Sequence, residues 1–482
     1  MSAEVNAPVP TPEQTGLRAN TIGLMGVLFQ SITTMAPASA VAFSLGAAIP
    51  FTGGALPLAT LIALVVCILV AINIGSMARY LPSAGSYFTY VSRALGPQAG
   101  WMTGWLFNLA YLLIVPFQLL VLGPVADQFA NNYLSIHFGA NGWIVWAAVF
   151  AVVIFLLTYF GIRISANAGV ILGCIEIAVF VVLSVWLIFA PGTHNTSAAF
   201  SPGSSPQGWQ GVLVGMLFVF TAFAGFESSA PLAEESHNPR RTVPRAVLLS
   251  TILIGLFYIL CSYAGVAGWN IDKLSGYLQD ADPWFTLAGR IWGGVSLIVI
   301  LTILNSALAN SNAGINAITR TLYAMGRTRT LPPLLAHLNR FKIPDVALFF
   351  SLLVAVVMTL VAGLLYGPFP GGFSFIGAIL TFPILIVYIA TSVSVCVFYW
   401  REHREEFNVL LHVIIPLIPA LVLIGVIYEQ VIALTAPSNL AVPIVIGWFV
   451  LGLIIVILLS LFAPAALARA NRVYSEGSVE EG

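Results

Sequence analysis

Two acidic residues lie inside apolar stretches of the chain, where an unpaired charge is costly. Glu227 lies in FVFTAFAGFESSAPLAEES (residues 218–236), and Glu176 lies in NAGVILGCIEIAVF (residues 167–180). A charge deep in a bilayer is unfavourable unless it is paired or neutralised. Glu227 could therefore sense protons or neutralise an amine, or it could hydrogen-bond locally loosened backbone. Both residues are candidates for proton-linked chemistry.

The composition excludes an ordinary soluble enzyme. The chain has 482 residues, of which 59% are hydrophobic and 7% are charged, whereas soluble domains carry about 25% charged residues. The net charge is zero, which gives no reason to expect a nucleic-acid partner. The sequence has no nucleotide P-loop, no HExxH motif and no Cys/His cluster, so we expect no ATP-driven step, no metal, no cofactor and no enzymatic activity.

Runs of about 20 apolar residues predict an all-α polytopic membrane protein. We expect twelve spans near 22–48, 56–79, 98–129, 142–160, 166–190, 210–232, 246–267, 290–320, 346–366, 373–399, 411–430 and 441–463. If the N-terminus is cytoplasmic, the outer loops hold only Lys273 and Arg290 of the 18 basic residues. The positive-inside rule therefore places both termini in the cytoplasm.

The segments between the spans are expected to be short. Residues 1–20 are polar and Pro-rich and predict a disordered tail, with a second tail at 466–482. Residues 130–141 and 191–208 look like flexible outer connections. The spacing in 268–289 predicts a short helix lying across the outer surface.

The first and sixth spans each contain a residue that interrupts a helix. Pro37 lies in SITTMAPASAVAF, and Gly225 lies in TAFAGFESSAP. Proline removes a backbone donor, and glycine leaves helical geometry at low cost. Breaks at corresponding places of two repeats are typical of transporter binding sites, since freed N–H groups attract a carboxylate and freed carbonyls suit an ammonium. The alternative is a simple kink in each helix.

The eighth span carries a stripe of amides and hydroxyls. In NSALANSNAGINA, positions 305, 312 and 316 share one helical face, as do 306 and 310. This face is expected to line a cavity or to pack against the first helix, and interhelical hydrogen bonding is the alternative role. Asn310 and Ser311 could offer oxygen atoms to a cation. We assign Asn305 to substrate binding, and Asn310 and Ser311 to coupling or gating.

Three long stretches resemble the amino acid–polyamine–organocation superfamily. They are ARYLPSAGSYFTYVSRALGPQAGWMTGW (78–105), the loop between helices two and three, FAGFESSAPLAEESHNPRRTVPRAV (223–247), and NAITRTLYAMGRTRTLPPLLAHLNRFKIP (316–344). The resemblance covers nearly the whole chain. It implies a LeuT-type fold of two inverted five-helix repeats, over 21–190 and 209–400, with two further helices over 405–465. It also implies alternating-access transport of an amino acid or amine.

The resemblance also implies which residues bind the substrate. In such proteins the substrate carboxylate meets N–H groups at the first break, and the amine meets carbonyls at both breaks. The corresponding positions in this sequence are Thr34, Met35, Ala36, Pro37, Ala38 and Ser39 in the first helix, and Phe220, Thr221, Ala222, Phe223, Ala224 and Gly225 in the sixth.

The sequence departs from the family pattern at two places. Many members carry a glycine cluster at the first break, where this chain has Ala-Pro-Ala, and Pro37 supplies no N–H to a carboxylate. Several proton-coupled members carry a lysine in helix five at the position where this chain has Glu176. Glu176 could titrate and couple protons, help to hold a cation, or serve as a protonated structural group.

Further side chains are candidates for lids and gates. Tyr111 and Phe223 could close over a bound substrate, although most membrane aromatics are core or interface residues. The carboxylates of EESHNPRR (234–241) are expected to pair with loop arginines and to hold one gate closed. A Glu or Asp at the position of Glu227 is common in the resembling family, whatever the substrate. This favours a gating role for Glu227 over direct pairing with the substrate.

Together these features predict a secondary active permease of the cytoplasmic membrane. It would import an amino acid or a related small amine, with protons as the coupling ion. An exchanger that needs no ion is the alternative within this class, and a channel or a transporter-like sensor is the alternative outside it. The substrate itself is not specified by the sequence.

Overall fold

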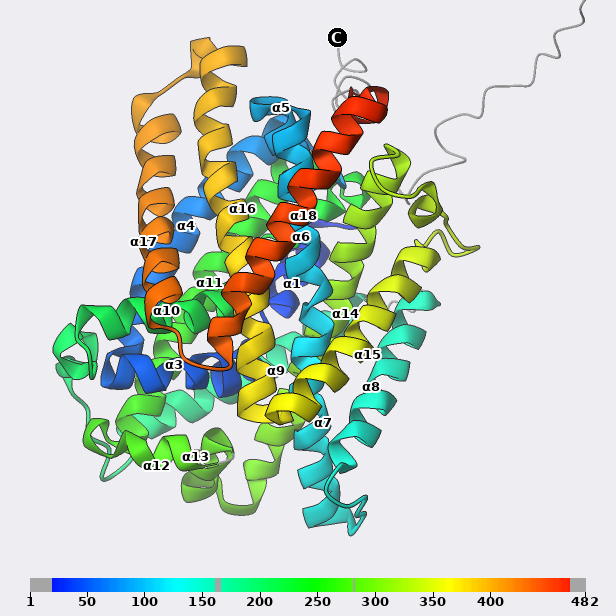
Figure 1. The fold of residues 1–482 in the computed structure, drawn as a ribbon. Coiled ribbons are helices and arrows are strands. Elements are labelled where there is room, and N and C mark those ends of the chain that lie inside the picture. The colour runs from blue at the N-terminus through cyan, green and yellow to red at the C-terminus, as the bar shows by residue number, and fades with distance from the viewer. Residues whose placement is uncertain (1–19, 161–165, 281, 469–482) are drawn as a thin grey trace, which may run out of the picture.

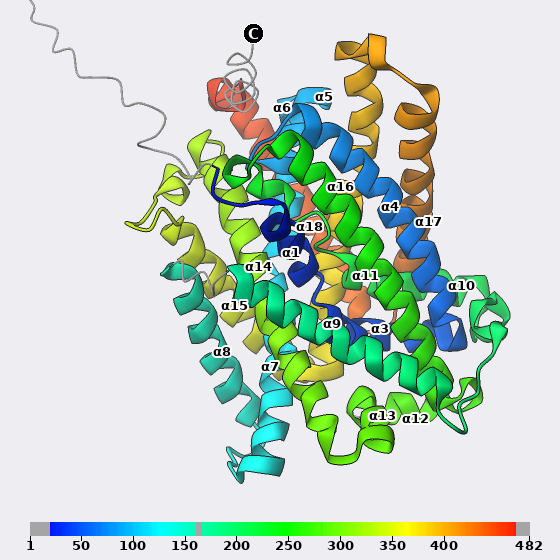
Figure 2. The ribbon, with the colours of Figure 1, turned by 180° about the vertical axis from the view of Figure 1, so that it is seen from behind.

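The computed structural model describes residues 20–160, 166–280 and 282–468. Over these residues the fold is a bundle of helices (Figures 1 and 2), and the one β-type pairing is an isolated bridge between Ile22 and Ser236. The two expected tails lie mostly outside the described residues. The described chain ends lie at one end of the bundle, and α12 and α13 lie at the other (Figure 1).

The first predicted span is broken, as Pro37 predicted. It consists of α1 (Leu24–Thr34), the short α2 (Pro37–Ser39), a π-helical turn and α3 (Leu45–Thr52). Ala36 between α1 and α2 has a left-handed backbone, with φ 47°. A residue before proline is disfavoured in the right-handed helical region, so the helix stops here and restarts at Pro37.

The rest of the first half contains one helix that was not predicted. Its helices are α4 (Leu56–Tyr80), α5 (Ser86–Leu95), α6 (Pro97–Leu112), α7 (Ile114–Phe129), α8 (Gly142–Tyr159) and α9 (Ala166–Phe189). α5 lies where only a loop was expected. The third span is divided at Leu113, because Pro116 has no N–H to donate to the carbonyl of Leu112.

In the second half the sixth span is broken. α10 (Trp209–Phe223) ends before Gly225, well short of the expected 232, and a 3₁₀ segment (Ala230–Glu235) follows the break. The remaining helices are α11 (Pro239–Trp269), α12 (Leu274–Gln279), α13 (Pro283–Trp292), α14 (Leu297–Arg327), α15 (Asp345–Tyr366), α16 (Phe373–Glu402), α17 (Ile415–Ala433) and α18 (Ala441–Phe462). The predicted outer helix is present as α12 and α13.

The twelve predicted spans map onto these helices. Ten segments of the described chain are long and apolar enough to cross a membrane. The first of them, Leu24–Tyr80, contains both the first and second predicted spans, and the sixth span is the shorter apolar helix Trp209–Phe223. The bundle is therefore that of a multi-pass membrane protein.

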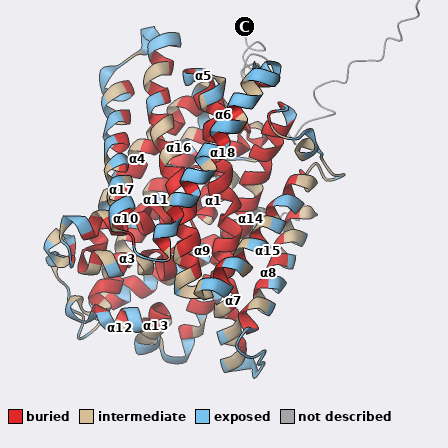
Figure 3. Ribbon diagram, viewed as in Figure 1, coloured by how far each residue is buried: buried red, intermediate tan, exposed pale blue. Residues whose placement is uncertain are grey.

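Apolar residues fill the inside of the bundle and also lie on its outside, and Figure 3 shows which positions are buried and which are exposed. The lipid-facing sides of α17 and α18 expose large apolar residues such as Leu421 and Leu461, as expected where hydrocarbon replaces water. α18 is fixed to α6 by two stacked indoles, Trp105 and Trp448, each of which donates its N–H to the other's carbonyl, at 2.9 and 3.1 Å. α4 and α11 pack closely along the centre, because Gly255 leaves room for Leu64.

Candidate functional site

The two helix breaks touch each other at the centre of the bundle. Gly225 has φ +121°, and a Cβ atom there would lie 2.7 Å from the carbonyl carbon and oxygen of Thr34. Only glycine combines this backbone with such a close approach. Ser228, just past the break, donates to the hydroxyl of Thr34 at 2.7 Å, and the N–H of Ser229 donates to the hydroxyl of Ser31 at 3.3 Å. The sixth helix thus meets the first at the point where both lose helical geometry.

The carbonyls freed at the breaks already have donors. The amide of Asn310 donates to the carbonyl of Thr34. The hydroxyl of Tyr258, in α11, lies 2.6 Å from the carbonyl of Met35 and 3.0 Å from that of Ala222. Tyr258 therefore bridges the two breaks with one hydroxyl, although sequence reasoning did not single it out. The available signal was a tyrosine inside an apolar span, whose hydroxyl must find a partner when buried.

Glu227 is fully buried and joins three elements. One carboxylate oxygen accepts from Tyr111 of α6 at 2.8 Å, and the other accepts from Tyr388 of α16 at 2.9 Å. The backbone N–H of Gly225 also donates to it, at 3.0 Å. The bond from Gly225 is the hydrogen bond to loosened backbone that one interpretation of Glu227 expected. The partners on α6 and α16 appear only in the fold.

The other predicted residues at the breaks are buried around this centre. Ser39 donates to the side chain of Gln118 at 3.2 Å, and Thr221 lies 2.6 Å from the hydroxyl of Thr381. The Phe223 ring meets the Tyr258 ring edge-on. The remaining predicted positions here are also buried, namely Met35, Ala36, Pro37, Ala38, Phe220, Ala222 and Ala224. Their roles in substrate binding stay predictions.

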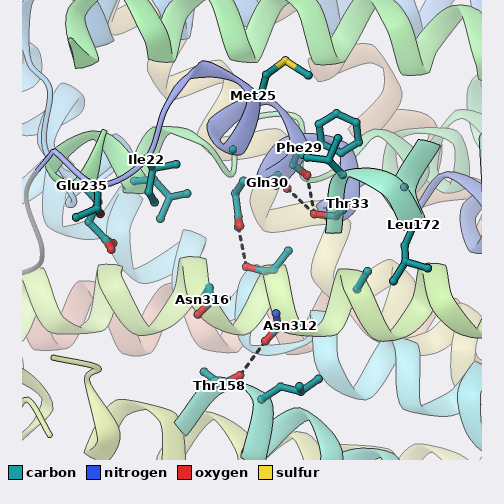
Figure 4. Close-up of a pocket in the computed structure, with 18 of the residues that line it drawn as sticks. Ile22, Met25, Phe29, Gln30, Thr33, Thr158, Leu172, Glu235, Asn312 and Asn316 are labelled. Atoms are coloured by element: carbon teal, nitrogen blue, oxygen red, sulfur yellow. Dashed lines mark hydrogen bonds between the residues drawn. The ribbon is translucent and has the colours of Figure 1, made fainter. Parts of the chain in front are cut away.

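A cavity of about 660 Å³ lies beside α1, and Figure 4 shows residues that line it. Its walls come from α1, α8, α9 and α14 and from the segments near Glu235 and Phe341. Two predicted site residues, Glu176 and Asn305, line it. The predicted positions from Thr34 to Ser39 and from Phe220 to Gly225 do not. The cavity is therefore distinct from the contact between the breaks.

The polar face of α14 divides between this cavity and α1, as its periodicity predicted. Asn305, Asn312 and Asn316 line the cavity, whereas Asn310 packs against α1. Asn305 donates to Glu176 at 3.2 Å. Asn312 accepts from Thr158 of α8 at 3.0 Å, as Figure 4 shows. The hydroxyl of Ser311 donates to the carbonyl of Ala307 within its own helix, at 2.9 Å.

The carboxylates of EESHNPRR pair with arginines, as expected, and both of these arginines belong to α14. Glu235 contacts Arg320 at 2.5 and 3.3 Å, and both side chains are less than 10% exposed. Glu234 contacts Arg327 at 3.1 Å with 25% and 35% exposure of the two side chains. The sixth-helix segment is thus tied to the end of α14. Arg327 was expected in the loop after residue 320, but α14 extends to it, about two turns beyond the expected end of the helix.

Comparison with known proteins agrees with this architecture. The model of the amino acid permease family matches residues 26–467. The chain is 27% identical over 341 residues to the branched-chain amino acid permease BcaP of Lactococcus lactis subsp. cremoris (strain MG1363), covering 64% of this chain and 68% of the relative. It is 25% identical over 338 residues to the low-affinity putrescine importer PlaP of Escherichia coli (strain K12), covering 67% and 70%.

A third relative is matched over only half of its own length. The chain is 26% identical over 305 residues to the general amino-acid permease GAP2 of Candida albicans (strain SC5314 / ATCC MYA-2876), covering 60% of this chain and 50% of the relative. The family match spans nearly all of the described bundle, including both broken helices and the ion pairs at the end of α14. The chain therefore belongs to the amino acid permease family, a family of transporters and not of enzymes, with a LeuT-like fold.

Proposed function

We propose that the protein imports an amino acid or a related small amine across the cytoplasmic membrane, coupled to protons. The observation that carries the proposal is the contact between the two breaks, where Gly225 meets Thr34. Backbone groups are concentrated there, and α2 begins at Pro37 with a first turn whose N–H groups have no intrahelical acceptor. Such a helix start suits a carboxylate.

The carbonyls at the breaks suit the ammonium end of the substrate. In the described conformation they accept from Asn310 and Tyr258, both neutral donors. An incoming ammonium can replace these donors, since a charged donor makes a stronger hydrogen bond to a carbonyl than a neutral one does. Substrate binding then requires Tyr258 and Asn310 to move away. The substrate in this proposal carries a free amino group.

Coupling is assigned to Glu176. It is 1% exposed, it accepts from the amide of Asn305 at 3.2 Å, and the hydroxyl of Ser306 lies beside it. Its helix, α9, packs against α1, so its charge acts on the helix that carries the first break. A proton that neutralises this carboxylate removes the cost of a buried charge. Proton binding and movement of α1 are linked in this way.

The first experiment identifies the substrate. Purified protein is screened for thermal stabilisation against amino acids and amines, since a ligand that binds the folded state raises its stability. Compounds with a free amino group are expected to stabilise it, and their N-acetylated forms are not. Equal stabilisation by N-acetylated forms would overturn the assignment of the break carbonyls.

The second experiment tests coupling. Uptake of the identified substrate into proteoliposomes is measured with and without an inward proton gradient. The gradient is expected to drive accumulation in the wild type, whereas Glu176→Gln keeps exchange of substrate for substrate but loses the accumulation. Asp127→Asn, the same change at a carboxylate outside the site, is the control. Gradient-driven accumulation by Glu176→Gln would rule out Glu176 as the coupling group, and its absence in the wild type would favour the exchanger.

A further inference from the structure

The cavity beside α1 has two chemically different parts. Its walls are largely apolar, with side chains such as Phe29, Leu172 and Leu308. At one end it reaches Glu176 and Asn305. At the other it reaches Arg320, which lies 15 residues further along α14, or about 22 Å at 1.5 Å per residue. A volume of about 660 Å³ falls within the range of small-molecule sites.

The charged side chains that line the cavity differ in the partners that they contact. Arg320 and Glu235 neutralise each other in the ion pair described above. Lys342 also lines the cavity. Glu176 accepts from the amide of Asn305 at 3.2 Å, and the hydroxyl of Ser306 lies within hydrogen-bonding reach of the same carboxylate, so both of these donors are neutral. A buried carboxylate is normally paired with a positive charge, and these two neutral donors do not supply one.

A primary ammonium group supplies what is missing. It carries three N–H donors and a positive charge, which matches a carboxylate oxygen and a hydroxyl oxygen lying together. The apolar walls match a hydrocarbon chain attached to it. A carboxylate end would face Glu176 unfavourably, and an uncharged alcohol would leave the carboxylate unpaired.

We propose that this cavity is a second binding site, which takes an amphipathic amine with its ammonium group on Glu176 and its hydrocarbon chain against Phe29 and Leu308. The site is separate from the contact between the breaks, because residues 34–39 and 220–225 do not line it. A ligand here lies between α1, α9 and α14, and it holds α1 in place. Inhibition of transport by such a ligand rests on the proposed function, whereas the binding does not.

The test is the thermal stability of the purified protein with n-hexylamine, n-hexanol and hexanoate at equal concentrations. Hexylamine is expected to raise the unfolding midpoint of the wild type, and the other two are not. Glu176→Gln is expected to weaken hexylamine binding by about tenfold or more, the range for loss of a hydrogen bond to a charged group. Asp127→Asn, with the same change outside the cavity, is expected to bind hexylamine as the wild type does.

A cavity-filling variant keeps the test decisive if Glu176→Gln folds poorly. Ala309 lines the cavity, and Ala309→Phe is expected to abolish the hexylamine effect while leaving Glu176 unchanged. Equal stabilisation by hexanol or hexanoate, or an undiminished hexylamine effect in both variants, would overturn the proposal. Uptake assays then show whether hexylamine slows transport. Hexylamine binding without slower uptake would leave the site standing and would remove its link to the movement of α1.

Discussion

The buried ion pair between Glu235 and Arg320 should make one end of the bundle sensitive to the loss of either partner. Arg320 contacts both oxygens of Glu235, and it also donates to the backbone and side-chain oxygens of Asn316. The backbone carbonyl of Glu235 in turn accepts from the N–H groups of Thr21 and Ile22, which precede α1. The pair therefore connects α14, the end of the sixth helix and the start of the first.

The expected size of its contribution follows from its burial. Removing one partner of a buried pair leaves an uncompensated charge and costs about 3–5 kcal/mol. At about 1.4 kcal/mol per factor of ten, Arg320→Gln should raise the fraction of open molecules roughly 100-fold or more. The exposed pair between Glu234 and Arg327 is worth about 0.2–1 kcal/mol, so Arg327→Gln should raise it at most about fivefold.

Amide hydrogen exchange measures this opening directly. The reporters are the N–H groups of Thr21, Ile22 and His237, which bond across the segment that the ion pair holds. Their exchange rates follow the population of open molecules. Exchange should rise strongly in Arg320→Gln and slightly in Arg327→Gln. The double variant Glu235→Gln/Arg320→Gln should regain most of the protection, because no buried charge is left unpaired.

Two results would contradict this reasoning. Similar exchange in Arg320→Gln and Arg327→Gln would mean that burial does not decide the strength of these pairs. A double variant as open as Arg320→Gln would mean that the specific ion pair, and not the unpaired charge, holds the segment.

Three further predictions concern the breaks and the outer helices. Gly225→Ala should destabilise the fold by at least about 1–3 kcal/mol from backbone strain alone, and its Cβ would also clash with Thr34. Thermal unfolding measures this loss of stability. Gly289→Ala is the control, because a Cβ at Gly289 meets open space. Tyr258→Phe should cost about 1–3 kcal/mol, because it leaves buried carbonyls without a donor, and a melting temperature equal to that of the wild type would refute the bridge. Burial raises the pKa of Asp282 from 3.8 to about 6, and the nearby charge of Asp280 adds to the rise. The protonated group contributes up to about 3 kcal/mol to the free energy of unfolding. This contribution is full below pH 3.8 and is lost as the pH rises through about 6. Unfolding midpoints measured between about pH 4 and pH 7 should therefore fall, and Asp282→Asn, which keeps a helix-capping side chain, should remove this fall.

The sequence was sufficient for the spans and the breaks, since these depend on local properties. The length of an apolar run decides whether it crosses a bilayer, and the backbone restrictions of Pro37 and the freedom of Gly225 decide where a helix stops. The structure confirmed both breaks. The amphipathic helix α5 was missed, because a short helix packed among spans differs little in sequence from a polar loop.

The partners of the site residues were decided only by the tertiary structure. Glu227 was conspicuous in the sequence, but Tyr111 lies 116 positions away and Tyr388 lies 161 positions away. Glu176 was conspicuous too, although Asn305 is 129 positions distant. The free energy that brings such residues together comes from packing between helices, and no local pattern encodes it.

The cavity shows the same division most clearly. The 3.6-residue period of α14 predicted that Asn305, Asn312 and Asn316 share a face, which the fold confirms. That this face meets Glu176 in an open space, while Asn310 on the neighbouring face closes onto α1, follows from where α9 and α1 pack. Sequence periodicity thus determined which side chains point the same way, and helix packing alone determined what they meet there.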